Sequence, residues 1–127
     1  MPTYALSPVF NPQYCATGAA AALSLATPGA GTVVPANLAI QIAVLRVANN
    51  SNAPVTLEIW RVPAGAAADN AHLVVPSVSI PVATNTFPQF DVTALWGAVL
   101  QAGDAIWAVA GSASALVIQG DGVVITP

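Results

Sequence analysis

The chain has 127 residues, a length that suits one domain of about 100–200 residues. Hydrophobic residues make up 56% of it and charged residues 6%, whereas a typical globular domain has about 25% charged residues. Two arginines and a net charge of −3 provide no basic cluster for phosphates, which argues against nucleic-acid binding. So few charges disperse a lone monomer poorly, and the composition therefore predicts that neighbouring subunits cover much of the surface.

The apolar runs are too short for a membrane helix, which needs about 20 consecutive apolar residues. The longest runs are 19–26 and 38–47, and the second contains Gln41 and Arg46. A small outer-membrane barrel would need aromatic girdles at both ends of its strands, which the few aromatic residues do not provide, so we expect no membrane association. Cys15 is the only cysteine, which excludes an internal disulfide and suits a reducing cytoplasm.

Residues 1–18 are predicted to form an extended, proline-rich N-terminal arm. Pro2, Pro8 and Pro12 fix φ and remove backbone donors, which disfavours a helix. Apolar side chains follow the same path, and they predict that the arm packs on its own domain or on a neighbour. These side chains are Tyr4, Leu6, Val9, Phe10 and Tyr14.

Residues 19–127 are predicted to form a single antiparallel β-sandwich or jelly roll, because short apolar runs alternate with turn residues. Alanines give the run 20–25 some helix propensity, but it ends at Thr27-Pro28-Gly29 and the later segments have strand patterns. The expected strands, in chain order, are 20–25, 38–47, 55–62, 72–75, 77–82, 86–92, 104–110 and 116–125.

The second and third of these strands alternate with period two, and the polar turn 49–52 predicts a hairpin between them. The alternation places Ile40 and Ile42 inward and, when extended, Arg46 inward as well. It places Trp60 on the outward face of its strand, exposed in a lone subunit. Further along, Pro76 and Pro81 interrupt strands and predict edges or bends, and residues 120–122 predict a bulge or kink.

The order of several segments resembles a β-sandwich family common among small virion proteins of tailed bacteriophages. An apolar strand enters an Asn-Ser turn at 45–52, a second strand follows at 55–60, an Ala-Gly-Asp turn lies in 100–106, and a closing strand with a glycine kink covers 117–125. The resemblance covers about 90 residues. The proline-rich arm and the scarcity of charge depart from it, since similar proteins often have more polar surfaces.

This resemblance implies a head decoration, capsid-stabilising, head–tail or tail-associated protein that assembles as a symmetric oligomer. Its partners would be further copies of the chain, as a trimer or larger, and other virion proteins such as the major capsid protein. Its location would be the virion, after assembly in the host cytoplasm. The size and the few charges favour decoration of the head through a permanent, largely dry interface.

No set of residues predicts an enzyme or a cofactor. His72 is the only histidine, and no Gly-x-Ser-x-Gly motif presents a nucleophile, so we interpret His72 as a loop residue near a strand start. Cys15 has no cation beside it in the sequence and is predicted to be a small buried filler. Most of the acidic residues lie in turns or at strand ends, which leaves calcium binding as an open alternative without an Asp-x-Asp cluster to support it.

Contact residues are predicted from charge and from aromatic character. Arg46, Glu58 and Arg61 suggest a cross-strand or intersubunit ion pair, with a solvated strand end as the alternative for Arg46. Tryptophans are frequent interface anchors. The interface candidates are Tyr4, Phe10, Tyr14, Trp60, Trp107, Arg46, Glu58 and Arg61. The alternative function is a tail or fibre component that binds a receptor or a carbohydrate through Trp60 or Trp107, or that acts as a connector.

Overall fold

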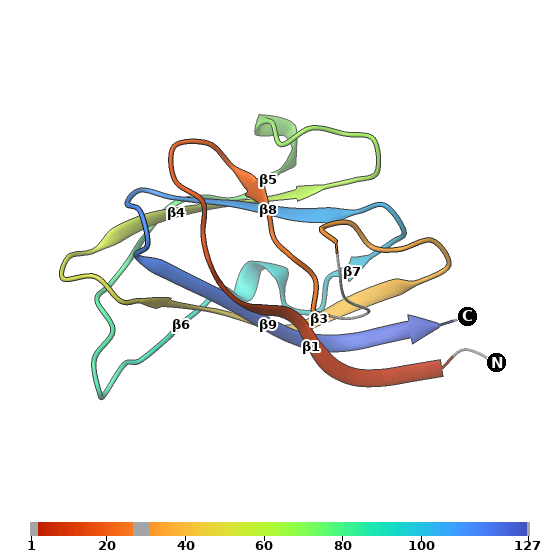
Figure 1. The fold of residues 1–127 in the computed structure, drawn as a ribbon, viewed down its shortest axis with the longest axis horizontal. Coiled ribbons are helices and arrows are strands. Elements are labelled where there is room, and N and C mark those ends of the chain that lie inside the picture. The colour runs from red at the N-terminus through yellow and green to blue at the C-terminus, as the bar shows by residue number, and fades with distance from the viewer. Residues whose placement is uncertain (1–2, 27–30, 127) are drawn as a thin grey trace.

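The structure is a computed structural model that describes residues 3–26 and 31–126 (Figure 1). The described residues form nine strands and two short 3₁₀ helices. The strands are β1 (Thr3–Tyr14), β2 (Ala21–Ala22), β3 (Ala39–Asn49), β4 (Val55–Val62), β5 (Leu73–Ile80), β6 (Phe90–Asp91), β7 (Val99–Leu100), β8 (Ala105–Ala110) and β9 (Leu116–Thr126). The 3₁₀ helices are η1 (Asn70–His72) and η2 (Thr93–Leu95).

The strands form two antiparallel sheets that face each other, which confirms the predicted β-sandwich. The first sheet has the order β1-β9-β3-β6, with the short β7 also paired to β3. The second sheet has the order β2-β8-β4-β5. Most consecutive strands lie in different sheets, the exceptions being β4 with β5 and β6 with β7. The pairing is that of an eight-stranded jelly roll in which β6 and β7 share one strand position. Figure 1 shows the two layers above one another.

The core lies between the sheets and is built from aliphatic side chains that alternate along the long strands. Each such side chain stabilises the fold by about 1.5–3 kcal/mol when it is fully buried. The largest fully buried side chains are Phe10, Ile40, Ile42, Leu45, Leu57, Ile59, Ile80, Leu95, Leu100, Ile106, Leu116 and Ile118. They come from both sheets and from η2, so the sandwich holds one continuous core.

The N-terminal segment is extended as predicted, but it is a strand of the sandwich. β1 pairs with β9 from Thr3↔Thr126 to Tyr14↔Val117. The segment therefore packs on its own domain and not on a neighbouring subunit, the two alternatives that the sequence left open. The side chain of Phe10 is buried in the core, so this strand belongs to the folding unit.

The hairpin predicted between residues 38–47 and 55–62 is wrong, although both strands exist. β3 lies in the first sheet and β4 in the second. The buried Asn49 fixes the crossing of the chain from the first sheet to the second. Its Nδ2 donates to the carbonyl oxygens of Ala53 and Ile80, both at 2.9 Å. Its Oδ1 accepts from the backbone N–H of Ser51 at 3.0 Å. A polar turn specifies a reversal of the chain but not which sheet receives the next strand.

The predicted irregularity at Gly120-Asp121-Gly122 is present as two bulges in the neighbouring strands. In β1, Pro8 pairs with Asp121 and Phe10 with Gly120, which leaves Val9 as the extra residue. In β3, the register shifts between Ile42 and Val44, so Ala43 is extra there. Both neighbours of β9 therefore bulge opposite the same residue, where the flanking glycines let the backbones approach closely.

The remaining strands agree with the sequence in position and differ in length. Predicted strands 72–75 and 77–82 are one edge strand, β5, with a register shift at Pro76. The predicted strand 86–92 is reduced to β6, and 20–25 to β2 with an isolated bridge between Phe10 and Leu25. The described part of the chain contains no helix that is long and apolar enough to cross a membrane.

Candidate functional site

The most exposed apolar side chains lie on the outer face of the first sheet, where both chain ends meet. Tyr4 is 66% exposed and Leu6 86% exposed. In register across the sheet, Tyr4 pairs with Ile125 and Leu6 with Val123, and Ile125 in turn pairs with Ala39 of β3. We call these five residues the terminal stripe. None of them is charged, so the stripe is suited to a dry protein contact.

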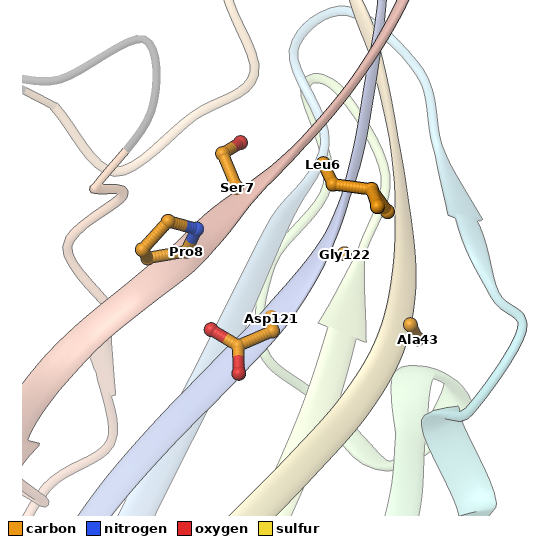
Figure 2. Close-up of a pocket in the computed structure, with 6 residues that line it drawn as sticks. All are labelled: Leu6, Ser7, Pro8, Ala43, Asp121 and Gly122. Atoms are coloured by element: carbon orange, nitrogen blue, oxygen red, sulfur yellow. The ribbon is translucent and has the colours of Figure 1, made fainter.

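Two open depressions border the terminal stripe. The first, of about 420 Å³, is lined by Leu6, Ser7, Pro8, Ala43, Asp121 and Gly122. Figure 2 shows Leu6 and the carboxylate of Asp121 on the same side of the sheet, at the double bulge. The second, of about 310 Å³, is lined by Asn37, Leu38, Ala39, Gln101, Ala102 and Ile125. Around the terminal stripe the outer face is therefore uneven and mostly apolar, with the carboxylate of Asp121 at its margin.

The aromatic candidates on β1 divide between surface and core. Tyr4 and Tyr14 are exposed, the latter at 57%. Phe10 is 1% exposed and lies in the core, because the bulge at Val9 brings two consecutive residues inward. Phe10 is therefore not accessible to a partner on the folded chain.

Arg46 points outward, which corrects the inward orientation that the alternation predicted. The bulge at Ala43 shifts the phase of β3, so Leu45 and Val47 become buried while Arg46 becomes exposed. Its Nε lies 3.1 Å from Oδ1 of Asp91, its register partner on β6. The cross-strand ion pair exists, but the acid is Asp91 and not Glu58.

We expect this ion pair to contribute little to stability. The side chains of Arg46 and Asp91 are 45% and 49% exposed, so water and salt screen the attraction. A double-mutant cycle of Arg46→Ala and Asp91→Ala, measured by urea unfolding, should give a coupling energy of about 0.2–1 kcal/mol that declines with added salt. A coupling that stays above this range in high salt would contradict the screening argument.

Trp60 faces outward as the alternation predicted, but its predicted exposure is wrong. It is 9% exposed, because Trp107 of β8 and Leu73 of β5 lie beside it in register. The segment that includes η1 also lies over this face of the second sheet (Figure 1). Trp107 is only half-buried. Of the two tryptophans proposed as contact residues, Trp107 is therefore the accessible one.

Glu58 and Arg61 lie apart from each other on β4. Glu58 is half-buried on the outer face and pairs with Val109. It borders a depression of about 340 Å³ lined by Thr17, Gly18, Thr56, Glu58, Val109, Ala110 and Gly111. Arg61 has the inward phase at the end of the sandwich, where its Nη2 donates to the carbonyl of Val99 in the opposite sheet. Arg61 therefore links the two sheets.

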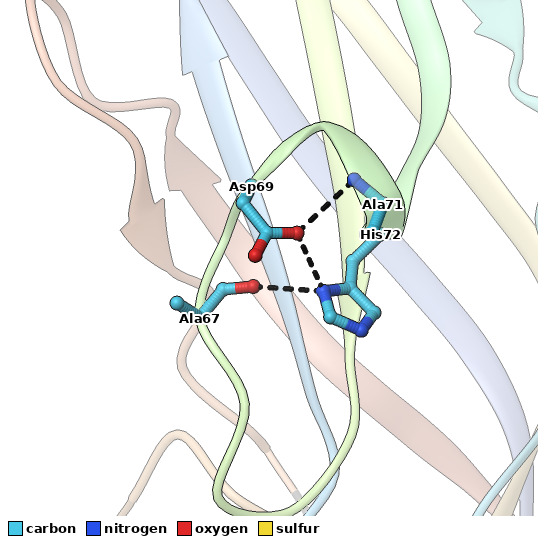
Figure 3. A network of polar contacts seen from close by, with 4 residues as sticks. All are labelled: Ala67, Asp69, Ala71 and His72. Atoms are coloured by element: carbon cyan, nitrogen blue, oxygen red, sulfur yellow. Dashed lines mark hydrogen bonds and ion pairs between the residues drawn. The ribbon is translucent and has the colours of Figure 1, made fainter.

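His72 is a loop histidine directly before β5, as predicted. Its Nδ1 lies 2.8 Å from Oδ1 of Asp69 and 3.0 Å from the carbonyl oxygen of Ala67 (Figure 3). The same Asp69 oxygen accepts from the backbone N–H of Ala71 at 3.1 Å. These contacts close the loop before β5. Among the residues that the structure describes, no group of three or more His, Cys, Asp or Glu side chains could hold a metal ion.

Cys15 is buried, which confirms its prediction as a core filler. Burial penalises the thiolate and raises the pKa of Cys15 from 9.0 to about 12. The folded protein therefore keeps a proton that the unfolded chain releases above pH 9. Since the thiolate form is the nucleophile, the native thiol is inert at neutral pH.

Cys15 should therefore make stability decline in alkaline solution. Because the folded-state pKa is raised, the stabilisation is complete below about pH 9 and is lost as the pH rises toward 12. Urea unfolding between pH 8 and 11 measures the free energy of unfolding of the wild type and of Cys15→Ala. The difference between the two pH dependences isolates the contribution of the thiol. Equal pH dependence of the two proteins would contradict it.

Comparisons with known proteins give a likeness in structure and no match in sequence. No protein-family model matches the chain, and no curated protein matches it. A chain in the structure of infectious bursal disease virus, Gx strain, is similar to it with a TM-score of 0.51 and 10% sequence identity. The match covers 99% of this chain and 33% of the viral chain, so this chain spans about a third of the length of the chain it matches. At that identity the likeness shows the shared fold.

The outward residues of β9 are not among the contacts that the sequence predicts. An arm at 1–18 and a closing strand at 117–125 do not by themselves place Val123 and Ile125 beside Tyr4 and Leu6. Alternation was available as a signal in both segments, but only their pairing shows that the apolar residues share a face. Leu6, the most exposed large hydrophobic residue, is one of the apolar residues of the predicted arm but not one of the predicted contacts.

Proposed function

We propose that the protein is a structural component of a tailed-phage virion, an oligomer that decorates or stabilises the capsid through apolar contacts. The observation that carries this proposal is the jelly-roll pairing of its sheets, matched over 99% of the chain by a chain of a virus structure. Jelly rolls are common in viral capsid and lectin domains. In this proposal the chain is not an enzyme and needs no cofactor.

The surface supports an assembly role. Charged residues are 6% of the chain, and the terminal stripe exposes Tyr4 and Leu6 next to further apolar residues. Permanent interfaces resemble the inside of a domain and tolerate few charges. The partners in this proposal are copies of the chain and the major capsid protein, with assembly in the host cytoplasm.

Quantitative mass spectrometry of purified particles tests the proposal. A decoration protein should remain bound through density-gradient purification and through a high-salt wash, because apolar contacts are not screened by salt. Its copy number should follow that of the major capsid protein across preparations. Loss of the protein at the first gradient, with intact capsids recovered without it, would contradict a structural role on the capsid.

A tail or fibre role is the second candidate, and the outer face of the second sheet favours it. Trp107 and Val109 are both half-buried and lie two residues apart on β8, so their side chains point to the same face. Val109 borders the depression that Thr17, Thr56 and Glu58 line. An indole on the same face of a sheet as hydroxyl and carboxylate groups suits a sugar ring. Binding to a glycan array that Trp107→Ala abolishes would favour this role over capsid decoration.

A further inference from the structure

The N-terminal half of β1 is an open sheet edge. Thr3–Ser7 pairs with β9 on one side, and on its other side no strand lies within residues 3–26 and 31–126. Further along, the same edge is covered: the carbonyl of Val9 accepts from the N–H of Ala26 at 2.7 Å, and the Gln13 side chain bonds to Ser24. We call Thr3–Ser7 the open edge.

The open edge lacks the features that normally keep sheet edges apart. Such features are charged side chains, prolines, bulges and very short strands. The edge strand β5 contains Pro76 and a register shift, and the edge strands β2 and β6 have two residues each. Thr3–Ser7 has no charge, no proline and no register shift. Its backbone groups are therefore ready to pair with another strand.

We propose that two copies of the chain pair through their open edges, antiparallel, about a two-fold axis at Ala5. This inference rests on the proposed oligomeric role and names the contact. Identical strands paired antiparallel are self-complementary by symmetry. Proline cannot donate to the ladder, so Pro8, together with Pro2 in the sequence, limits the pairing to five residues whose centre is Ala5. The first sheets of the two copies then form one continuous sheet.

The side chains fit this pairing. With Ala5 on the axis, Tyr4 of one copy lies opposite Leu6 of the other, and both have the outward phase of β1. An aromatic side chain beside an aliphatic one is a favourable cross-strand pair, and it covers the most exposed large side chain of the molecule. The pair occurs twice in the dimer because of the symmetry.

The charges also permit a second copy at this edge. The chain has a net charge of −3, yet Thr3–Ser7 contains no charged residue. On the neighbouring strand, Asp121 lies opposite Pro8, outside the proposed pairing. Two copies therefore meet here without close like charges. Five paired residues are fewer than the 20–30 per side of a standard interface, so we expect a reversible dimer that further contacts reinforce in a lattice.

Sedimentation velocity on the wild-type protein and on Leu6→Lys tests the pairing. The wild type should form a dimer whose population rises with concentration, whereas Leu6→Lys should be monomeric, since a charge on the edge blocks strand pairing. Leu6 is 86% exposed, so the variant keeps the fold, which circular dichroism verifies. A wild type that stays monomeric up to about 1 mM would overturn the proposal.

Single cysteines locate the contact. Directly opposite residues of antiparallel strands have Cα atoms about 4.5–5.5 Å apart, within the range of a disulfide. Ala5→Cys should therefore form a disulfide-linked dimer at least tenfold faster than Ala113→Cys, an exposed control in the β8–β9 loop. The native Cys15 is buried and does not compete. Equal rates would overturn the proposal, whereas the presence of the protein in virions is a separate result that tests the proposed function.

Discussion

Gly122→Ala should lower the free energy of unfolding by about 3–5 kcal/mol, a loss typical of severe packing defects in a core. A Cβ at this position would lie 2.0 Å from the carbonyl oxygen of Gln41 and 3.0 Å from Cγ2 of Val9. The first of these atoms belongs to the backbone of β3 and cannot rotate away. The substitution therefore forces β9 and β3 apart at the double bulge.

Gly65→Ala is the matched control, with unfolding of both variants followed in urea. Gly65 lies in a loop with a φ of +76°, and a Cβ there meets no atom within 4 Å. Only the left-handed conformation opposes the alanine, at about 1–2 kcal/mol. An equal loss of unfolding free energy in the two variants would contradict the close approach of β3 and β9 at Gly122.

Phe10→Ala should destabilise the protein by about 3–5 kcal/mol, the usual cost of removing a buried phenylalanine. Phe10 is 1% exposed and packs over Gly120, where its Cδ2 lies 3.1 Å from the position a Cβ would take. The prediction separates an integral strand from an arm, since an arm held only by a neighbouring subunit would contribute nothing to the stability of a single chain.

Tyr14→Ala, on the same strand, is the control for Phe10→Ala. Tyr14 is 57% exposed, and the truncation of an exposed side chain usually changes stability by less than about 0.5 kcal/mol. Thermal unfolding monitored by circular dichroism compares the two variants. A small effect of both would mean that β1 is detached from the core in solution.

The fold class could be predicted because alternating apolar and polar residues indicate the long strands. The apolar residues around Ile42, Leu57 and Ile118 gave strands close to β3, β4 and β9. The partition into sheets could not be predicted, since alternation specifies which side of a strand is buried and not which strand lies next to it. Asn49 illustrates this: the sequence predicts a turn residue, and in the structure its buried amide binds Ile80 of the other sheet and so fixes the crossing of the chain.

The candidate contacts were predicted less well, for two physical reasons. A bulge reverses the phase of a strand, and nothing in the sequence at Ala43 or Val9 indicates one. Alternation alone therefore predicts an inward Arg46, and it does not separate the buried Phe10 from the interface candidates of the arm. Exposure also depends on neighbouring strands: Trp60 points away from the core and is still covered by Trp107. Tyr4 and Tyr14 are exposed and remain contact candidates.

Immunogold electron microscopy of intact particles that carry the protein tests its central role most directly. Antibodies against the folded chain, followed by gold-labelled secondary antibodies, locate it without any change to the particle. Label spread evenly over the head is the result that capsid decoration predicts, and depleted capsids should then be more fragile to heat and to osmotic shock. Label confined to the tail, its tip or the neck would contradict decoration and favour the adhesion or connector role.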